Sequence, residues 1–187
     1  MSKDRTWRGR VFIGMSLDGY IARPDSDLGW LTDPPAGIKH ERITSDRQAL
    51  DYGAFIGSID HVVMGRGTYD KALTFDAWPY EDQQTIVLST TLRPPAAPRI
   101  TCARSVPEVV SLLERRAREV YVDGGQVIRA FLAAGLVDEI SIGTVPVLIG
   151  TGIPLFGQFS GDDVQLRLRA ANASENGMTH ATYDVVR

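Results

Sequence analysis

The sequence predicts an α/β protein whose central sheet is mixed but mostly parallel and ends in a C-terminal antiparallel hairpin. Short apolar runs, typical of buried strands, alternate with segments whose apolar residues recur at helical spacing. Two last strand-like runs, at 164–173 and 179–186, are joined near Asn176-Gly177, a favoured hairpin turn. Strand–helix alternation followed by a hairpin indicates a mixed sheet.

The N-terminal half begins with a strand that leads into a turn at 16–19 and returns to extended structure at 20–22. Proline and glycine mark 23–43 as a long loop, and long loops in compact domains are often functional. Ser45 and Gln48 fit a capping box that opens a helix to about residue 57. The predicted strands of this half are 10–15, 61–64, 84–88 and 99–103.

The C-terminal half carries two further helices. Ser105 and Glu108 form a second capping box, which opens a helix to about Arg118. Another helix is predicted from about Gln126 to Ala134, with Gly135 as its cap. The remaining predicted strands are 119–122, 137–147 and the two strands of the hairpin.

Length and composition fit one ordinary globular domain over residues 1–187, with 43% apolar and 23% charged residues. The net charge of −3 argues against a nucleic-acid surface. No apolar stretch reaches the ~18 residues of a membrane span, and the polar start does not resemble a signal peptide. Cys102 is the single cysteine, and His40, His61 and His180 lack ligand spacing. We expect a cytoplasmic protein without a metal.

Two glycine-bearing turns are the strongest functional signal. Gly65-Arg66-Gly67-Thr68 follows the strand 61–64, and Asp123-Gly124-Gly125-Gln126 follows 119–122. A helix start offers unpaired N–H groups to a phosphate, and glycine permits close approach. Two such turns predict a ligand with more than one phosphate, such as a dinucleotide. The second turn lacks the Rossmann spacing and the P-loop lysine. Both turns also fit simple strand-to-helix packing.

Hydroxyl groups follow the strand 84–88, where Ser89 and Thr90 could bind a phosphate or a ribose. Such residues more often cap or form a turn. Arg93 and Arg104, nearby in sequence, could add positive charge or be solvated surface. Asp18, after the first strand and beside Gly19, fits either an Asx-type turn or an acid near a substrate.

These four segments, in this order, resemble the dihydrofolate-reductase-like superfamily, and the stretch 145–156 adds a fifth match. The resemblance covers about residues 8–187 and implies a three-layer α/β/α fold. Ser16-Leu17-Asp18-Gly19 and Trp30-Leu31-Thr32 look closer to the reductase domain of the bifunctional riboflavin-biosynthesis deaminase/reductase and its stand-alone relatives. The zinc signature of a deaminase is absent from the sequence.

The resemblance implies an NADPH-dependent reductase, with NADPH across the carboxyl ends of the strands. The implied cofactor-binding residues are Gly65, Arg66, Gly67, Thr68, Ser89, Thr90, Gly124, Gly125, Gln126 and Val127. The implied substrate residues are Ser16, Asp18, Trp30, Tyr52 and Trp78, with Asp18 as the candidate catalytic acid. A hydride would pass to a C=N or C=O group of a small heterocyclic or ribosyl-amine substrate, such as 5-amino-6-(5-phosphoribosylamino)uracil.

Two alternatives stay open. One is dihydrofolate or pterin reduction, although Gly29-Trp30 stands where dihydrofolate reductases have Pro-Trp, and the matching early helix position lacks a carboxylate. The other is a non-catalytic NADPH-binding protein or scaffold of the same fold. The resemblance also implies a homodimer, for which the long strand 137–147 would offer apolar surface.

Overall fold

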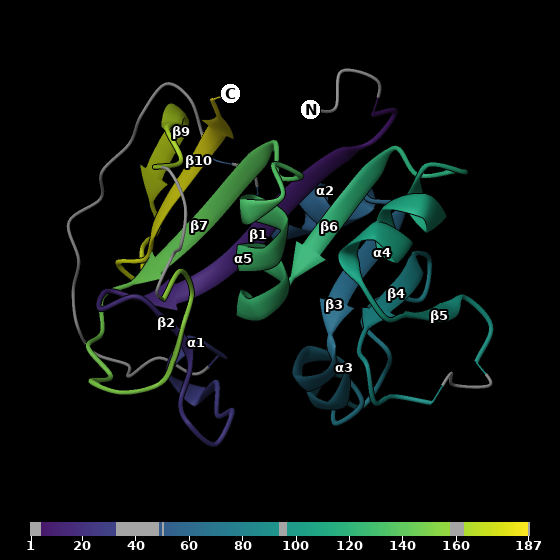
Figure 1. The fold of residues 1–187 in the computed structure, drawn as a ribbon. Coiled ribbons are helices and arrows are strands. Elements are labelled where there is room, and N and C mark those ends of the chain that lie inside the picture. Colours follow the sequence, from purple (N-terminus) through teal and green to yellow (C-terminus); the bar gives the residue numbers. More distant parts are fainter. Residues whose placement is uncertain (1–4, 33–48, 50, 94–96, 158–162, 187) are drawn as a thin grey trace.

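The computed structural model describes residues 5–32, 49, 51–93, 97–157 and 163–186, and they form one eight-stranded sheet with helices on both faces (Figure 1). The sheet order is β5-β4-β3-β6-β1-β7-β10-β9. Its strands are β1 (Arg8–Ser16), β3 (His61–Gly65), β4 (Gln84–Leu88), β5 (Ile100–Ala103), β6 (Glu119–Asp123), β7 (Glu139–Val145), β9 (Leu166–Ala173) and β10 (Thr179–Val185). A separate pair joins β2 (Tyr20–Ala22) to β8 (Ile153–Pro154).

The sheet is mixed, as the sequence predicts. From β5 to β7 every neighbouring pair is parallel, whereas β10 runs antiparallel to β7 and to β9. The carboxyl ends of the parallel strands therefore meet at one edge of the sheet. The last two strands form the predicted hairpin, with Gly177 at positive φ in its turn.

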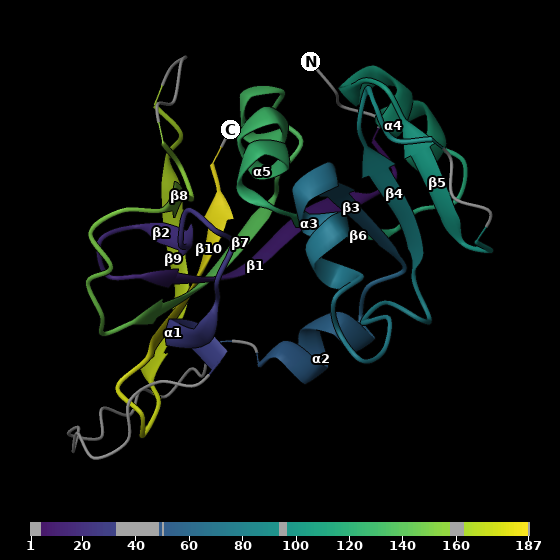
Figure 2. The ribbon, with the colours of Figure 1, turned by 90° about the horizontal axis from the view of Figure 1, so that it is seen from below.

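Alternating side chains divide the core between the two faces. On one face Val63, Val120 and Val122 pack with α4 (Val106–Leu113) and α5 (Gly125–Ala133). On the other, Met64 and Tyr121 pack with Phe55 of α2 (Tyr52–Gly57) and Tyr69 of α3 (Arg66–Ala72). Figure 2 shows α4 and α5 on one side of the sheet, with α2 and the short α1 (Gly29–Thr32) on the other. The fold is thus three-layered.

Local signals account for most helix ends. Ser105 caps α4, because its hydroxyl accepts a hydrogen bond from the Glu108 N–H at 3.4 Å. Gly135, at φ +66°, follows α5, where its N–H and that of Leu136 bond back to the last turn as in a Schellman motif. The helix α4 is shorter than predicted and ends at Leu113.

The helix predicted from Ser45 begins later. Residues 49 and 51 are not helical, and α2 starts at Tyr52. Its cap is Asp51, whose carboxylate accepts a hydrogen bond from the Ala54 N–H at 2.9 Å. Ser45 and Gln48 themselves lie outside the described residues. Asp51, which was not predicted as a cap, therefore opens α2.

The strand predicted at 137–147 is the shorter β7, and it pairs with β1 on one side and β10 on the other. Six of its seven residues are buried. The argument that this strand offers apolar surface to a second copy is therefore wrong, because its own sheet covers it. None of the helices in the described ranges is long and apolar enough to cross a bilayer.

A buried ion pair ties β1 to β7 at the end of the sheet where these strands begin. The Glu139 carboxylate accepts hydrogen bonds from Arg10 Nε at 2.8 Å and contacts Arg10 Nη2 at 2.7 Å. Glu139 is only 2% exposed, and Arg10 is 7% exposed. Arg169 of β9 reaches the same carboxylate. Arginines of two strands, β1 and β9, thus share one buried carboxylate of β7.

We expect Glu139→Gln to lower the free energy of unfolding by about 3 kcal/mol, because it leaves the buried Arg10 without a full countercharge. The control is Arg167→Gln, which removes an exposed partner of Asp184 and should cost less than ~1 kcal/mol. Urea unfolding at pH 7 measures both. Equal small losses in the two variants would contradict a structural role for the buried pair.

Candidate functional site

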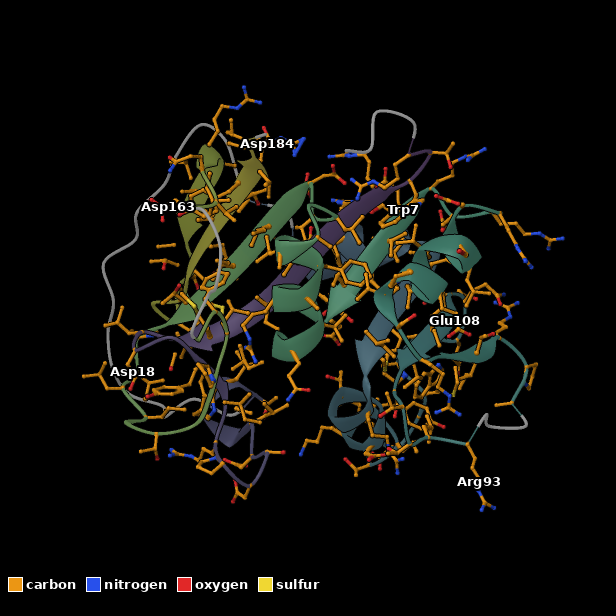
Figure 3. All side chains as sticks on the ribbon, viewed as in Figure 1. Trp7, Asp18, Arg93, Glu108, Asp163 and Asp184 are labelled. Carbon is orange, nitrogen blue, oxygen red and sulfur yellow. The ribbon has the colours of Figure 1, made fainter. Side chains whose placement is uncertain are left out.

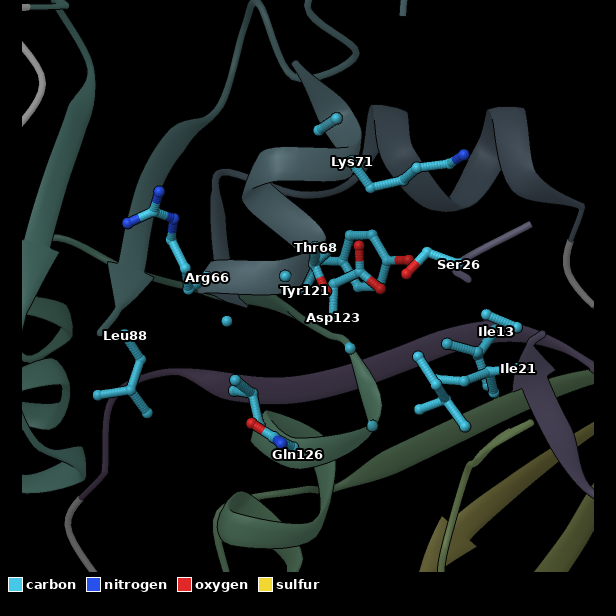
Figure 4. Close-up of a pocket in the computed structure, with 18 of the residues that line it drawn as sticks. Ile13, Ile21, Ser26, Arg66, Thr68, Lys71, Leu88, Tyr121, Asp123 and Gln126 are labelled. Carbon is cyan, nitrogen blue, oxygen red and sulfur yellow. The ribbon is translucent and has the colours of Figure 1, made fainter. Parts of the chain in front are cut away.

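A cavity of about 1020 Å³ opens at the carboxyl ends of the parallel strands. Figure 4 shows Arg66, Leu88 and Gln126 on one side of it and Ile13, Ile21 and Ser26 on the other, with Thr68, Tyr121 and Asp123 between. The volume is at the upper end of the range for ligand pockets. It can hold a large ligand, or two ligands in contact.

The structure brings the predicted cofactor residues together around this cavity. They come from three segments far apart in sequence: the turn after β3, the residues after β4 and the turn after β6. The lining includes Gly65, Arg66, Gly67, Thr68, Ser89, Thr90, Gly124, Gly125, Gln126 and Val127. The glycine turns thus face one common space, as expected for turns that bind different parts of one ligand.

The helix starts in these turns are free to accept an anion. Gly65 caps α3 and Gly124 caps α5, and neither has a side chain that could bond the first N–H groups. By contrast, Ser105 satisfies an N–H of α4. Uncapped N–H groups at a helix start favour a phosphate or another anion. The cradle therefore fits a phosphorylated cofactor.

The two glycine turns pack directly on each other. A Cβ atom at Gly124 would lie 2.3 Å from the Thr68 hydroxyl oxygen, far inside contact distance. Gly124 also has φ +86°, a conformation that residues with a side chain rarely adopt. Glycine is required here for both reasons. This contact fixes the position of the first turn of α3 relative to the end of β6.

Two arginines provide positive charge on the cavity wall. Arg66 is exposed, and its Nε contacts both Asp70 oxygens, at 2.7 and 2.6 Å. Arg104 lines the cavity and donates from Nη1 to the Ser89 carbonyl at 2.7 Å. The Ser89 hydroxyl accepts the Leu92 N–H at 3.1 Å, so it also stabilises its own turn. Arg93 is exposed and is not among the lining residues.

Asp123 lines the cavity but is not among the site residues predicted from the sequence. It is 8% exposed and accepts a hydrogen bond from the Tyr80 hydroxyl at 3.0 Å. Burial raises the pKa of Asp123, while the Tyr80 hydroxyl and the Gly124 N–H partly oppose the shift. The residue was part of the turn motif, but only the fold shows its carboxyl buried among tyrosines.

Asp18 has a different setting. Its carboxylate accepts hydrogen bonds from the Ser16 hydroxyl at 2.6 Å and the Gly150 N–H at 2.7 Å, and from the Ile149 N–H at 3.2 Å. The Ser16 bond is the main cause of the lowered pKa of Asp18. Neither Ser16 nor Asp18 lines the cavity, and Figure 3 shows Asp18 at the periphery. Its role as an acid stays a prediction, while its bonds connect two loops.

Of the three aromatic residues predicted to form walls of the substrate site, one lines the cavity and two do not. Tyr52 lines the cavity, and its ring packs edge-on to Phe12 with 5.5 Å between centroids. Trp30 is 6% exposed and Trp78 packs against Tyr69 and Tyr80, but neither tryptophan lines the cavity.

Of the long loop 23–43, residues 33–43 lie outside the described part; Ser26, Leu28 and Leu31 line the cavity. Among the described residues, no cluster of potential metal ligands was found.

We expect Gly124→Ala to lower the free energy of unfolding by about 3 kcal/mol, because it adds both strain and a clash with Thr68. In a Thr68→Ala background the clash is relieved, and the cost should fall to about 1.5 kcal/mol. Urea unfolding of the four proteins in this double-mutant cycle gives the coupling. Strict additivity would show that the two turns do not constrain each other.

Asp18→Asn should destabilise the fold in a pH-dependent way. Because the folded-state pKa of Asp18 is lowered, its ionised form contributes stability above the unfolded-state pKa, and that contribution is lost as the pH falls through the folded-state value. Wild type should therefore be more stable than the variant at pH 7, and the gap should close below about pH 4. Urea unfolding across this range measures it, and a gap independent of pH would exclude a role for the charge.

The comparisons with known proteins agree with this architecture. Residues 9–180 match the family model described as the RibD C-terminal domain. YwjB of Bacillus subtilis, an uncharacterized protein, is 27% identical over 164 residues, which cover 85% of this chain and 87% of that protein. A putative riboflavin biosynthesis protein from Shewanella sp. PV-4 has a similar structure, with TM-score 0.80 and 30% identity over 96% of this chain and 99% of that one.

More distant structures share the fold. Dihydrofolate reductase from Enterococcus faecalis, complexed with NADP(H) and RAB-propyl, has TM-score 0.66 at 14% identity, with 98% of each chain covered. The deaminase/5-amino-6-(5-phosphoribosylamino)uracil reductase from Thermotoga maritima has TM-score 0.67 at 17% identity, and the match covers 97% of this chain and 57% of that one. The chain belongs to the family of RibD C-terminal domains and has a dihydrofolate-reductase-like fold.

Proposed function

We propose that this protein is an NADPH-dependent reductase. The observation that carries the proposal is the cavity itself, where two uncapped, glycine-bearing helix starts face one space beside a buried carboxyl. Family membership and the likeness to a dihydrofolate reductase complexed with NADP(H) support it. A cytoplasmic location and a homodimer remain part of the proposal.

The residues present fit this cofactor. Gly125 and Gln126 would hold the pyrophosphate at the start of α5, since the N–H groups there lack a side-chain cap, and Gly124, which has no side chain, would let the ligand approach closely. Arg66, with Ser89 and Thr90, would hold the adenosine side and its 2′-phosphate. NADPH, when bound, supplies a hydride to the substrate. The protein contributes binding, orientation and electrostatics around that transfer.

Reduction of a C=N or C=O bond also needs a proton at the nitrogen or oxygen. We assign it to the Asp123 carboxyl, because this group lines the cavity and burial favours its protonated form. The proton would pass from the carboxyl oxygen to the substrate heteroatom, and solvent would restore it. Tyr80 positions the carboxyl through its hydroxyl. Asp18 is the alternative acid, and the same assay distinguishes the two.

The substrate class follows from the family. RibD C-terminal domains and the uracil-reductase likeness favour a small heterocycle or ribosyl-amine, such as 5-amino-6-(5-phosphoribosylamino)uracil. Dihydrofolate or pterin reduction is the second candidate, supported by the structural likeness to a dihydrofolate reductase. A protein that binds NADPH without turnover would show affinity for the cofactor but no oxidation with either substrate.

We expect NADPH to bind at least ~10-fold more tightly than NADH, because Arg66, Ser89 and Thr90 can interact with the 2′-phosphate. Arg66→Gln should reduce this preference. Arg93→Gln is the matched control, since that exposed arginine does not line the cavity. Calorimetry with both nucleotides measures the ratios. Equal affinities of the wild type for NADPH and NADH would refute the assignment.

Asp123→Asn should lower turnover by ~10²-fold or more while NADPH affinity changes by less than ~3-fold, as for a lost proton donor. Because burial raises the pKa of Asp123, wild-type kcat/KM should fall as the pH rises through that value, and this limb should be absent from the variant. NADPH oxidation with the uracil or folate substrate is the readout. A loss in Asp18→Asn but not in Asp123→Asn would move the acid to Asp18.

A further inference from the structure

The cavity continues beyond the glycine turns across the sheet toward β10. Gly14 of β1 lies opposite Gly143 of β7, which in turn lies opposite His180 of β10. Residues directly opposite one another share a face of the sheet, and all three line the cavity. A row of two glycines and one histidine therefore forms part of the cavity wall at the end away from the phosphate turns.

The glycines allow other side chains to lie close to the sheet. A Cβ atom at Gly14 would be 2.7 Å from Leu31 Cδ1, so Leu31 occupies the place of a side chain there. At Gly143 a Cβ atom would be 3.4 Å from Nδ1 of His180 and 3.2 Å from the Met178 sulfur. The imidazole thus rests against the bare backbone of β7 and is held in place by packing.

His180 is a polar, half-buried residue of this wall. Within the part of the chain that the structure describes, no hydrogen bond to its imidazole is found, although the ring lines the cavity. Burial lowers the pKa of His180, which favours the neutral ring with one donor and one acceptor nitrogen. A half-buried polar group in a cavity wall is typical of a position that orients a ligand.

The separation between Asp123 and His180 sets the length of a ligand that could contact both residues. Tyr121 and Asp123 are two residues apart on β6 and therefore point to the same face of the sheet. Phe12 and Gly14 of β1 point to this face as well. From β6 to β10 there are three strand spacings, about 14 Å between backbones at ~4.8 Å each. Phe12 and Tyr52 line the space between these ends with aromatic surface. A flat ring system with polar groups at both ends matches this wall.

We propose that the His180 imidazole is a substrate-recognition group, which hydrogen-bonds one polar edge of a flat heterocycle whose other end lies toward the Asp123 carboxyl. The inference rests on the proposed reductase function and specifies its substrate site. His180 would determine which heterocycles bind and would not touch the phosphate turns. Its loss should therefore weaken substrate binding and leave cofactor binding unchanged.

The test is calorimetric titration of two probes, 7,8-dihydrofolate and 5-amino-6-(5-phosphoribosylamino)uracil, into the protein with and without NADP⁺. We expect His180→Leu to weaken binding of at least one probe by ~10-fold or more, because the substrate group loses its partner. His180→Gln, which keeps a donor and an acceptor, should stay within ~3-fold of wild type. NADP⁺ affinity should change by less than twofold in both variants.

The matched control is Thr179→Val, which removes a hydroxyl from the adjacent position of β10, on the opposite face. It should leave probe binding unchanged. A second readout is the imidazole carbon–proton NMR signal of His180, which should shift on addition of the probe and is assigned by its absence in His180→Leu. Unaltered probe affinity in His180→Leu, or no binding of either probe to wild type, overturns the inference. Failure of the wild-type protein to bind NADP⁺ would instead overturn the proposed function.

Discussion

The structure depends on one topological constraint, the parallel pairing from β5 through β7. Parallel strands place all their carboxyl ends at the same edge, so every turn that follows a strand emerges there. From β3 the chain winds outward to β5, returns to place β6 beside β1, and then crosses to β7 on the other side of β1. Ligands of open α/β sheets bind where the winding direction changes. Here the cavity lies at that place.

Strand β6 illustrates how the same pairing supports both stability and chemistry. Val120 and Val122 pack against α5 on one face, whereas Tyr121 and Asp123 point to the other. Burying a carboxyl group on a strand that is covered on both faces is unfavourable unless hydrogen-bond donors lie beside it. Tyr80 and the Gly124 N–H provide them. The end of β6 thus carries a hydrogen-bonded polar group, while the preceding valines of the same strand pack in the apolar core.

Local patterns predicted the strands, the hairpin, the α4 cap and the Gly135 turn, because each depends on residues within a few positions. The glycine turns also came from local pattern, and the fold then placed them in one cavity. The partners of Asp18 could not be found this way, because the Ile149 and Gly150 N–H groups lie 131 and 132 residues along the chain. The burial of Asp123 likewise depends on Tyr80, 43 residues away.

The contact between Thr68 and Gly124 has a consequence for changing what this protein binds. Since any side chain added at Gly124 would clash with Thr68, the two turns form a single rigid unit rather than two independently adjustable loops. Arg66 and Thr90, on the rim of the same cavity, are exposed and carry no such restriction. Libraries aimed at a different ligand should keep Gly124 and Thr68 constant and diversify Arg66 and Thr90.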